Sequence, residues 1–137
     1  MLFGREHVDR YVATDGEEGY VWREGTSILI LTTTGRRTGL PRSNALIFGR
    51  HGDDLLVVAS KGGAPRHPFW YENLQANPAV QVQVRGDRFA ARAHTATAEE
   101  KPVLWKTMTA AWPHYDEYQQ RTDREIPVVV LTRTSPA

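Results

Sequence analysis

Short strand-like runs separated by glycine-containing turns constrain the fold of this chain most. Turns with the sequences HGDD and RGDR each join two such runs and are typical of β-hairpins. The runs are rich in β-branched and apolar residues, and AVQVQV alternates with one polar face. They cover residues 27–33, 44–50, 55–60, 79–84, 89–96 and 126–132.

Two or three helices are expected between these runs. Pro68 is well placed to begin one helix, and Asn77-Pro78 to end it. Thr97 and Glu100 have the spacing of a capping box, and Pro113 interrupts the helix that follows. The order contains no βαβ alternation, so the pattern predicts a small closed or split antiparallel barrel with a few peripheral helices. The fold class is therefore mainly β, or α+β.

Length and composition predict one soluble globular domain. The 137 residues suffice for a real core, and 40% are hydrophobic and 24% charged. We expect an N-terminal arm at 1–25 and a single barrel domain at 26–137. The absence of cysteine excludes disulfides, thiolate catalysis and cysteine-ligated clusters. A formal net charge of +1 is too small for a dedicated nucleic-acid binder, so no nucleic-acid partner is expected.

The sequence contains no candidate targeting or membrane-spanning segment. The N-terminus MLFGREHVDR lacks the apolar stretch of a signal peptide. Apolar runs such as Ile28–Leu31 are far shorter than the roughly 20 residues that cross a bilayer. A cytoplasmic location is expected.

The turn GRRTGLPR is the first candidate binding element, because it gathers Arg36, Arg37 and Arg42. Gly35 and Gly39 are expected to supply left-handed backbone freedom. The arginines could simply be solvated at a hairpin tip, or they could bind a phosphate or carboxylate through charge-assisted hydrogen bonds. The turn alone favours neither interpretation.

Three further segments are candidates. In ASKGG, a hydroxyl, a lysine and two glycines would let backbone amides approach a ligand closely. PFWYENL places three aromatic residues on a short helix, where some serve the core and one could stack on a planar ligand. Trp112, Tyr115 and Tyr118 lie at i, i+3 and i+6, which suits either a core stripe or the wall of a substrate cleft.

No standard catalytic set is present. The five histidines are scattered without metal-ligand spacing, so no metal site is expected. Neither a nucleophile elbow, a phosphate-binding P-loop nor a dinucleotide fingerprint occurs. An enzyme built from this chain must take its chemistry from a cofactor.

Taken together, the motifs LTTTGRRTGLPRSN, VASKGG, PFWYENLQANPAVQVQ and YDEYQQRTDREIPVVVL resemble the deazaflavin (F420)-dependent nitroreductase family. They lie in order between residues 27 and 131. The resemblance implies a split β-barrel, of the FMN-binding split-barrel type, that binds coenzyme F420. It also implies hydride transfer from the reduced deazaflavin C5 to a quinone, enone or nitroaromatic acceptor.

The resemblance also implies roles for individual residues. Catalytic roles are expected for Ser60, which could hydrogen-bond the deazaflavin or a substrate carbonyl, and for Tyr115 and Tyr118, which could orient the acceptor or donate a proton. The acceptor pocket is expected to contain Ile47, Trp112, Tyr115 and Tyr118. The residues expected to bind the cofactor are Arg36, Arg37, Thr38, Arg42, Ser43, Asn44, Ala45, Leu46, Ile47, Val58, Ala59, Ser60, Lys61, Phe69, Trp70, Tyr71, Glu72, Asn73 and Tyr115.

Two positions depart from a nitro-reducing relative. Ile47 and Trp112 stand where that relative has tyrosines, and the loss of two hydroxyls should weaken recognition of a nitro group. Peripheral contact with the inner face of the membrane is expected only for a lipid quinone acceptor. Whether the chain is a monomer or a dimer stays open.

Three alternatives stay open beside this reading. The chain could be an FMN-binding flavin reductase or an oxidase of the pyridoxamine-phosphate type on the same fold. It could be a non-catalytic F420 carrier. The least favoured alternative is a β-hairpin nucleic-acid-binding module in which the arginine turn serves as the wing that contacts the nucleic acid.

Overall fold

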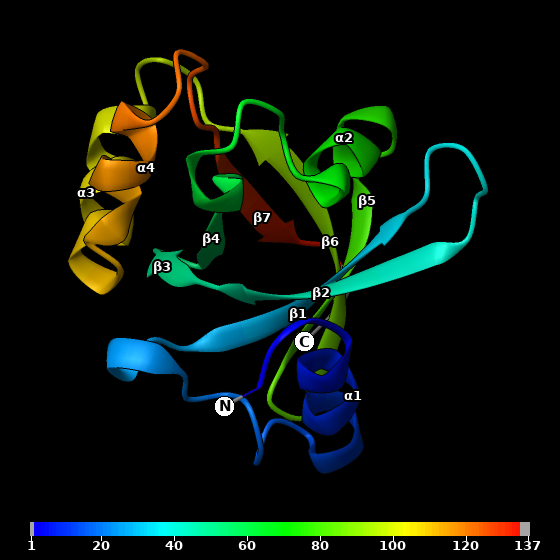
Figure 1. Cartoon of the computed structure of the whole chain (residues 1–137). Helices are drawn as coiled ribbons and strands as arrows, with labels where there is room; N and C mark the ends of the chain where they lie inside the picture. Colours follow the sequence, from blue (N-terminus) through cyan, green and yellow to red (C-terminus); the bar gives the residue numbers. More distant parts are fainter. Residues whose placement is uncertain (1, 135–137) are drawn as a thin grey trace.

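One curled antiparallel sheet dominates the computed structural model, which describes residues 2–134 (Figure 1). Its strand order is β2-β1-β5-β6-β7-β4-β3, so β2 and β3 occupy the two edges. Only Phe48 separates these edge strands in the sequence, and the sheet must therefore curl until its edges nearly meet. The strands are β1 (Ile28–Thr34), β2 (Pro41–Ile47), β3 (Gly49–His51), β4 (Asp54–Val58), β5 (Ala79–Val84), β6 (Asp87–Thr95) and β7 (Val128–Arg133).

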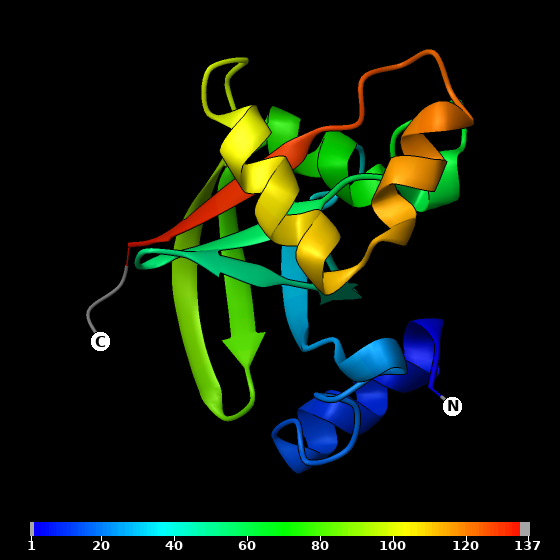
Figure 2. The same ribbon diagram turned by 90° about the vertical axis from the view of Figure 1, so that its left-hand side faces the viewer.

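Four helices surround the sheet: α1 (Gly4–Thr14), α2 (Phe69–Ala76), α3 (Lys101–Ala111) and α4 (His114–Gln120). The helices α3 and α4 lie side by side. Helix α1 lies beneath β1 and β2, far from α3 and α4 (Figures 1 and 2). Short 3₁₀ turns at Arg23–Gly25 and Lys61–Gly63 complete the element order. This arrangement confirms the split-barrel fold class expected from the sequence.

Strands β1, β4 and β7 are buried on both faces along most of their length, which explains their unbroken apolar runs. In β4 and β7, Val57 and Val129 face the interior of the curled sheet, while Leu56 and Val130 pack against α3. Each of these four side chains is at most 3% exposed. At roughly 25 cal/mol per Å² of apolar surface, such burial is the main favourable term for the fold.

Tyr11 fixes the N-terminal helix to the sheet. Its side chain is fully buried, and its hydroxyl donates to the Ile28 carbonyl oxygen over 2.9 Å. The same hydroxyl accepts a hydrogen bond from the Arg85 N–H over 2.7 Å. Burial raises the pKa of Tyr11, so the hydroxyl keeps its proton and serves as a structural bridge.

The structure corrects the sequence-based outline at two points. Instead of one strand at 44–50 it has β2 and β3, broken at Phe48, and so seven strands rather than about six. Gly39 has the expected positive φ of 72°, but Gly35 does not. Gly35 is instead required by close packing, because a Cβ there would lie 2.8 Å from Thr38 Oγ1.

The expected capping box is present. The Thr97 N–H donates to Glu100 Oε1 over 2.9 Å, and the Glu100 N–H donates to Thr97 Oγ1 over 3.2 Å. The helix α2 begins after Pro68 and ends before Asn77, as its flanking residues predict. Among the described residues, no helix is both long and apolar enough to cross a bilayer.

Candidate functional site

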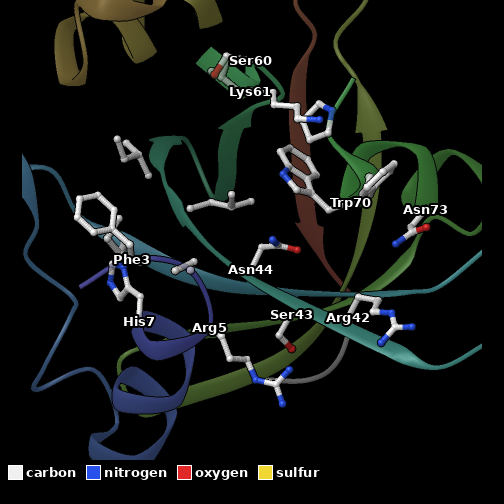
Figure 3. A pocket seen from close by; sticks show the side chains of 18 of the residues that line it. Phe3, Arg5, His7, Arg42, Ser43, Asn44, Ser60, Lys61, Trp70 and Asn73 are labelled. Atoms are coloured by element: carbon white, nitrogen blue, oxygen red, sulfur yellow. The ribbon is translucent and has the colours of Figure 1, made fainter. Parts of the chain in front are cut away.

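A cavity of about 980 Å³ opens along the free edge of β2 (Figure 3). The β1–β2 turn and β2 form one wall, and the Ser60–Gly62 loop and α2 form another. The N-terminal segment and α4 close the remaining side. The lining residues divide chemically into a basic end and an aromatic end.

Four cations, Arg36, Arg37, Arg42 and Lys61, line the basic end. Of these, only Arg36 forms an ion pair within residues 2–134, with Glu72 at 3.2 Å. The basic end therefore keeps an excess of positive charge where the β1–β2 turn approaches α2. Such an excess favours phosphate and carboxylate groups.

Arg36 is held in place by α2. Its backbone N–H and its Nη1 both donate to Asn73 Oδ1, over 3.2 and 3.3 Å. Asn73 is 4% exposed and donates in turn from Nδ2 to Thr33 Oγ1 over 3.2 Å. Because Glu72 and Asn73 restrain the guanidinium before any ligand arrives, little side-chain entropy remains to be lost on binding.

The loop that follows β4 carries Ser60 and Lys61 to the cavity. Lys61, Gly62 and Gly63 have positive φ values of 47°, 63° and 82°. Gly63 packs so closely on α4 that a Cβ would lie 2.5 Å from the Tyr118 carbonyl oxygen. The hydroxyl of Ser60 forms no hydrogen bond within the described chain, although the residue is only 8% exposed. It is therefore available to a ligand.

Arg124, in the linker after α4, braces this loop. Its guanidinium donates to the carbonyl oxygens of Ala59, Ser60 and Ala64 over 3.2, 2.7 and 2.8 Å. Its Nη1 also lies 3.1 Å from Nδ1 of His67. Burial and the neighbouring guanidinium lower the pKa of His67, which favours the neutral imidazole that can accept this bond.

Aromatic side chains from both ends of the sequence form the other end of the cavity. Trp22 meets Phe3 edge to face and packs at a tilt on Trp112, with both ring-centroid distances at 5.8 Å. Tyr115 and Tyr118 meet edge to face at 6.1 Å. Flat apolar surfaces of this kind suit a planar acceptor.

The two tyrosine hydroxyls differ in their surroundings. Tyr118 accepts a hydrogen bond from Trp112 Nε1 over 3.3 Å. Tyr115 is 5% exposed, and its hydroxyl has no hydrogen-bond partner among the described residues. Burial, followed by the neighbouring Tyr118, raises the pKa of Tyr115. Tyr115 therefore stays protonated and can donate a hydrogen bond into the cavity.

The structure brings most of the expected site residues to this one cavity. Three do not line it: Ala59 is fully buried, Glu72 lies behind Arg36, and Tyr71 is 3% exposed. The Tyr71 hydroxyl instead lies 2.7 Å from Thr95 Oγ1. The expected residues that do line the cavity are Arg36, Arg37, Thr38, Arg42, Ser43, Asn44, Ala45, Leu46, Ile47, Val58, Ser60, Lys61, Phe69, Trp70, Asn73, Trp112, Tyr115 and Tyr118.

The N-terminal segment contributes lining residues that the sequence did not reveal: Phe3, Arg5 and His7 (Figure 3), and Trp22. His7 is 3% exposed, and its Nε2 lies 2.8 Å from the Gly19 carbonyl oxygen. Phe3 and Trp22, two of the four aromatic residues in the arm, were the available signal. Their distance in sequence from the other motifs concealed their place in the site.

Comparison with known proteins identifies the family. A family model described as F420H(2)-dependent quinone reductase matches residues 2–133. The chain belongs to this family. This F420H(2)-dependent quinone reductase family match covers the N-terminal segment as well as the barrel, and it confirms the resemblance drawn from the sequence motifs.

Individual relatives support the same family membership. An F420H(2)-dependent quinone reductase of Mycobacterium tuberculosis is 42% identical over 132 residues, which cover 94% of this chain and 89% of that protein. A solved F420-H2 dependent reductase (FDR-A) is 41% identical with a TM-score of 0.71, covering 76% of this chain and 92% of that one. A solved structure described as a domain-swapped dimer has a TM-score of 0.73 at 38% identity, covering 93% and 95% of the two chains.

Proposed function

We propose that this protein is an oxidoreductase that uses F420H2 to reduce a quinone. One observation carries the proposal: a single cavity joins a basic end to an aromatic end, in a chain whose residues 2–133 match the quinone reductase family. When bound, the cofactor supplies the hydride from its deazaflavin C5. The chain itself needs no nucleophile or metal for that step.

The residues present fit this cofactor. F420 carries a phosphate and an oligoglutamate tail, and the basic end offers Arg36, Arg37, Arg42 and Lys61 to such anions. Trp70, 6% exposed, supplies an apolar surface for a ring system. Phe69 is 62% exposed, and the cations of Arg36 and Lys61 lie 5.7 and 5.4 Å from its ring centroid. We therefore assign the anionic part of the cofactor to the basic end.

The aromatic end is assigned to the acceptor. Tyr115 is proposed to donate a hydrogen bond to a quinone oxygen, because its hydroxyl is unpaired and its pKa is raised. The raised pKa favours this orienting role over full proton release. Ile47 and Trp112 carry no hydroxyl, which favours a quinone over a nitro group at this end.

A lipid quinone would require access from a membrane surface. Exposed apolar side chains lie around the cavity, with Phe3 and Phe69 in its lining at 53% and 62% exposure. Leu40, in the β1–β2 turn, is 55% exposed. We infer that these side chains could contact a bilayer while the acceptor headgroup reaches the aromatic end.

The decisive experiment is a titration of the purified protein with F420 and, separately, with FMN. Oxidation of F420H2 is then followed with a menaquinone analogue, in detergent and in vesicles, and with a nitroaromatic. The proposal expects binding of F420 and turnover with the quinone. Tight F420 binding without turnover of any quinone would instead indicate a carrier, and preferential FMN binding would indicate a flavin reductase.

A further inference from the structure

His7 is a buried histidine that reaches the aromatic end of the cavity. It projects from α1 towards the cavity (Figure 3). Its ring centroid lies 6.4 Å from that of Trp22, which packs in turn on Trp112. Although His7 is only 3% exposed, it contributes to the cavity lining. The imidazole therefore meets the space that is assigned to the acceptor.

The backbone holds this imidazole through one of its nitrogens. Nε2 of His7 lies 2.8 Å from the Gly19 carbonyl oxygen, and Nε2 must carry a proton because a carbonyl oxygen can only accept. The close approach requires a glycine, since a Cβ at Gly19 would lie 2.9 Å from Nε2, and φ there is 99°. The Nε2–H is thus kept whether the ring is neutral or charged, and any change of protonation takes place at Nδ1.

The other nitrogen, Nδ1, is open to the cavity. It has no hydrogen-bond partner within residues 2–134. It is not sealed from solvent either, because among the described residues only Arg133 has a buried side-chain nitrogen or oxygen without a partner. Neutral His7 therefore offers a hydrogen-bond acceptor at the cavity wall, and protonated His7 offers a donor.

The lining contains no second side chain of this kind. Among the described residues, no aspartate or glutamate lines the cavity, and His7 is its only histidine. The other ionisable residues of the lining are arginines, one lysine and two tyrosines, which are types that ordinarily keep their protons at neutral pH. Of these, Arg5 lies on α1 with His7, and Tyr115 and Tyr118 face the aromatic end from α4.

Reduction of a quinone requires a group that can release a proton. The hydride brings two electrons and one hydrogen, so one oxygen of the reduced acceptor is left as an anion that must take up a proton. Tyr115 is suited to orient the quinone, but its raised pKa opposes release of its own proton. The arginines and the lysine at the basic end hold their protons still more firmly in general.

We propose that His7 is a further catalytic residue, which donates a proton from Nδ1 to the oxygen of the reduced quinone. This inference rests on the proposed function. The Nδ1–H bond breaks, its electron pair stays on the nitrogen, and an O–H bond forms on the hydroquinone. Water that enters the cavity then returns a proton to Nδ1, while Nε2–H remains hydrogen-bonded to Gly19.

The test separates proton donation from support of the fold. His7→Gln places an amide nitrogen near the position of Nε2, so the bond to Gly19 can persist, but an amide does not donate a proton to the acceptor. His51→Gln, at an exposed position outside the cavity, is the matched control. Each protein receives saturating F420H2 and one of two acceptors. Menadione needs a proton as well as the hydride, whereas the N-methylacridinium cation becomes neutral on taking the hydride alone.

In His7→Gln, kcat with menadione should fall about a hundredfold, a usual contribution of general acid catalysis. The kcat with acridinium and the dissociation constant for F420 should change about twofold at most, and His51→Gln should behave as the wild type. An equal loss with both acceptors would make the role of His7 structural, and an unchanged kcat with menadione would show that water supplies the proton. Either result would overturn the inference. Failure of the wild type to oxidise F420H2 with menadione would instead refute the proposed function.

A second measurement depends neither on turnover nor on the folding of a variant. Wild-type protein with isotope-labelled histidine nitrogens is titrated with menadiol, the hydroquinone of menadione, in the absence of cofactor. The His7 ring is assigned in long-range proton–nitrogen spectra through its proximity to Trp22. We expect the Nδ1 resonance to shift strongly and the Nε2 resonance to shift little. An Nδ1 resonance that does not move would overturn the inference, because the reduced acceptor would then not reach this nitrogen.

Discussion

Arg124 donates a hydrogen bond from Nη2 to the carbonyl oxygen of Ser60 over 2.7 Å. Through this contact the linker that follows α4 holds the backbone of the loop after β4. Gln119 fixes the linker in turn, since its Nε2 donates to the Arg124 carbonyl oxygen over 2.8 Å and its Oε1 accepts from the Ile126 N–H over 2.9 Å. The cofactor loop and the helix that carries Tyr115 are thus connected through one guanidinium.

Arg124→Lys should weaken F420 binding, because an ammonium cannot bridge three carbonyl oxygens at once. We expect KM for F420H2 to rise about tenfold, while kcat at saturating F420H2 changes about twofold at most. The control is Arg121→Lys, since Arg121 donates to the loop only one long hydrogen bond, of 3.5 Å, to the Gly62 carbonyl oxygen. Unchanged KM in Arg124→Lys, or the same change in both variants, would show that the brace does not position the loop.

Gly63→Ala should destabilise the fold by about 2 kcal/mol, because the new Cβ would press against the α4 backbone at Tyr118. Gly62→Ala is the matched control: its φ is also positive, but no atom lies within 4 Å of the added Cβ. We expect a cost of about 1 kcal/mol there, from backbone strain alone. Equal free energies of unfolding in urea would contradict the close packing of the loop on α4.

The double substitution Arg36→Ala with Arg37→Ala should raise the dissociation constant for F420 by at least about tenfold, since each charge-assisted bond contributes roughly 1.5–3 kcal/mol. The loss should shrink as salt is added, because screening weakens the wild-type attraction too. Arg92→Ala, at an exposed position of β6, removes a positive charge outside the cavity and serves as the control. If the double variant binds F420 as tightly as the wild type, the arginine turn does not bind the cofactor and its side chains are simply solvated.

His114 should make stability depend on pH. Hydrogen bonds to Glu24 and then Glu117, at 2.9 and 2.7 Å, raise the pKa of His114. A raised pKa in the folded state means that the stabilisation is complete below the unfolded pKa of about 6.5 and is lost as pH rises through the folded pKa. The contact joins the Arg23–Gly25 turn to α4.

The measurement is the free energy of unfolding of wild type and His114→Gln at about pH 5.5 and about pH 8.5, on either side of that window. We expect the advantage of the wild type to be larger at the lower pH. Titrations of the other histidines are common to both proteins and cancel in the difference. An advantage that is the same at both values would show that the two carboxylates do not stabilise the charged imidazole.

Local chemistry predicted much of this structure. The Gly-containing turns predicted the hairpins, and the Thr97–Glu100 pair predicted the start of a helix. Pro113 predicted the break between α3 and α4. The break at Phe48 was missed because a single glycine, Gly49, follows it and no longer turn sequence marks it. The break follows from the closure of the sheet, which depends on contacts far apart in the sequence.

The candidate site also divides into residues that local sequence predicted and residues that only the tertiary structure revealed. The motif residues on β2 and in the Ser60–Gly63 loop were found because their own sequences are unusual. Phe3, His7 and Trp22 were missed because their place in the cavity is set by α1 packing on β1, through Tyr11. Tyr71 was expected at the cofactor, but helix geometry turns its ring from the cavity towards Thr95.

The two ends of the cavity are encoded in different parts of the chain. Its basic end comes from one continuous stretch, 35–73, whereas its aromatic end combines Phe3 and Trp22 with Trp112, Tyr115 and Tyr118. Substitutions among these aromatic residues should therefore change the choice of electron acceptor while residues 35–73 stay unchanged. Cofactor affinity should be kept as long as such changes spare Arg124 and the packing of α4 on Gly63.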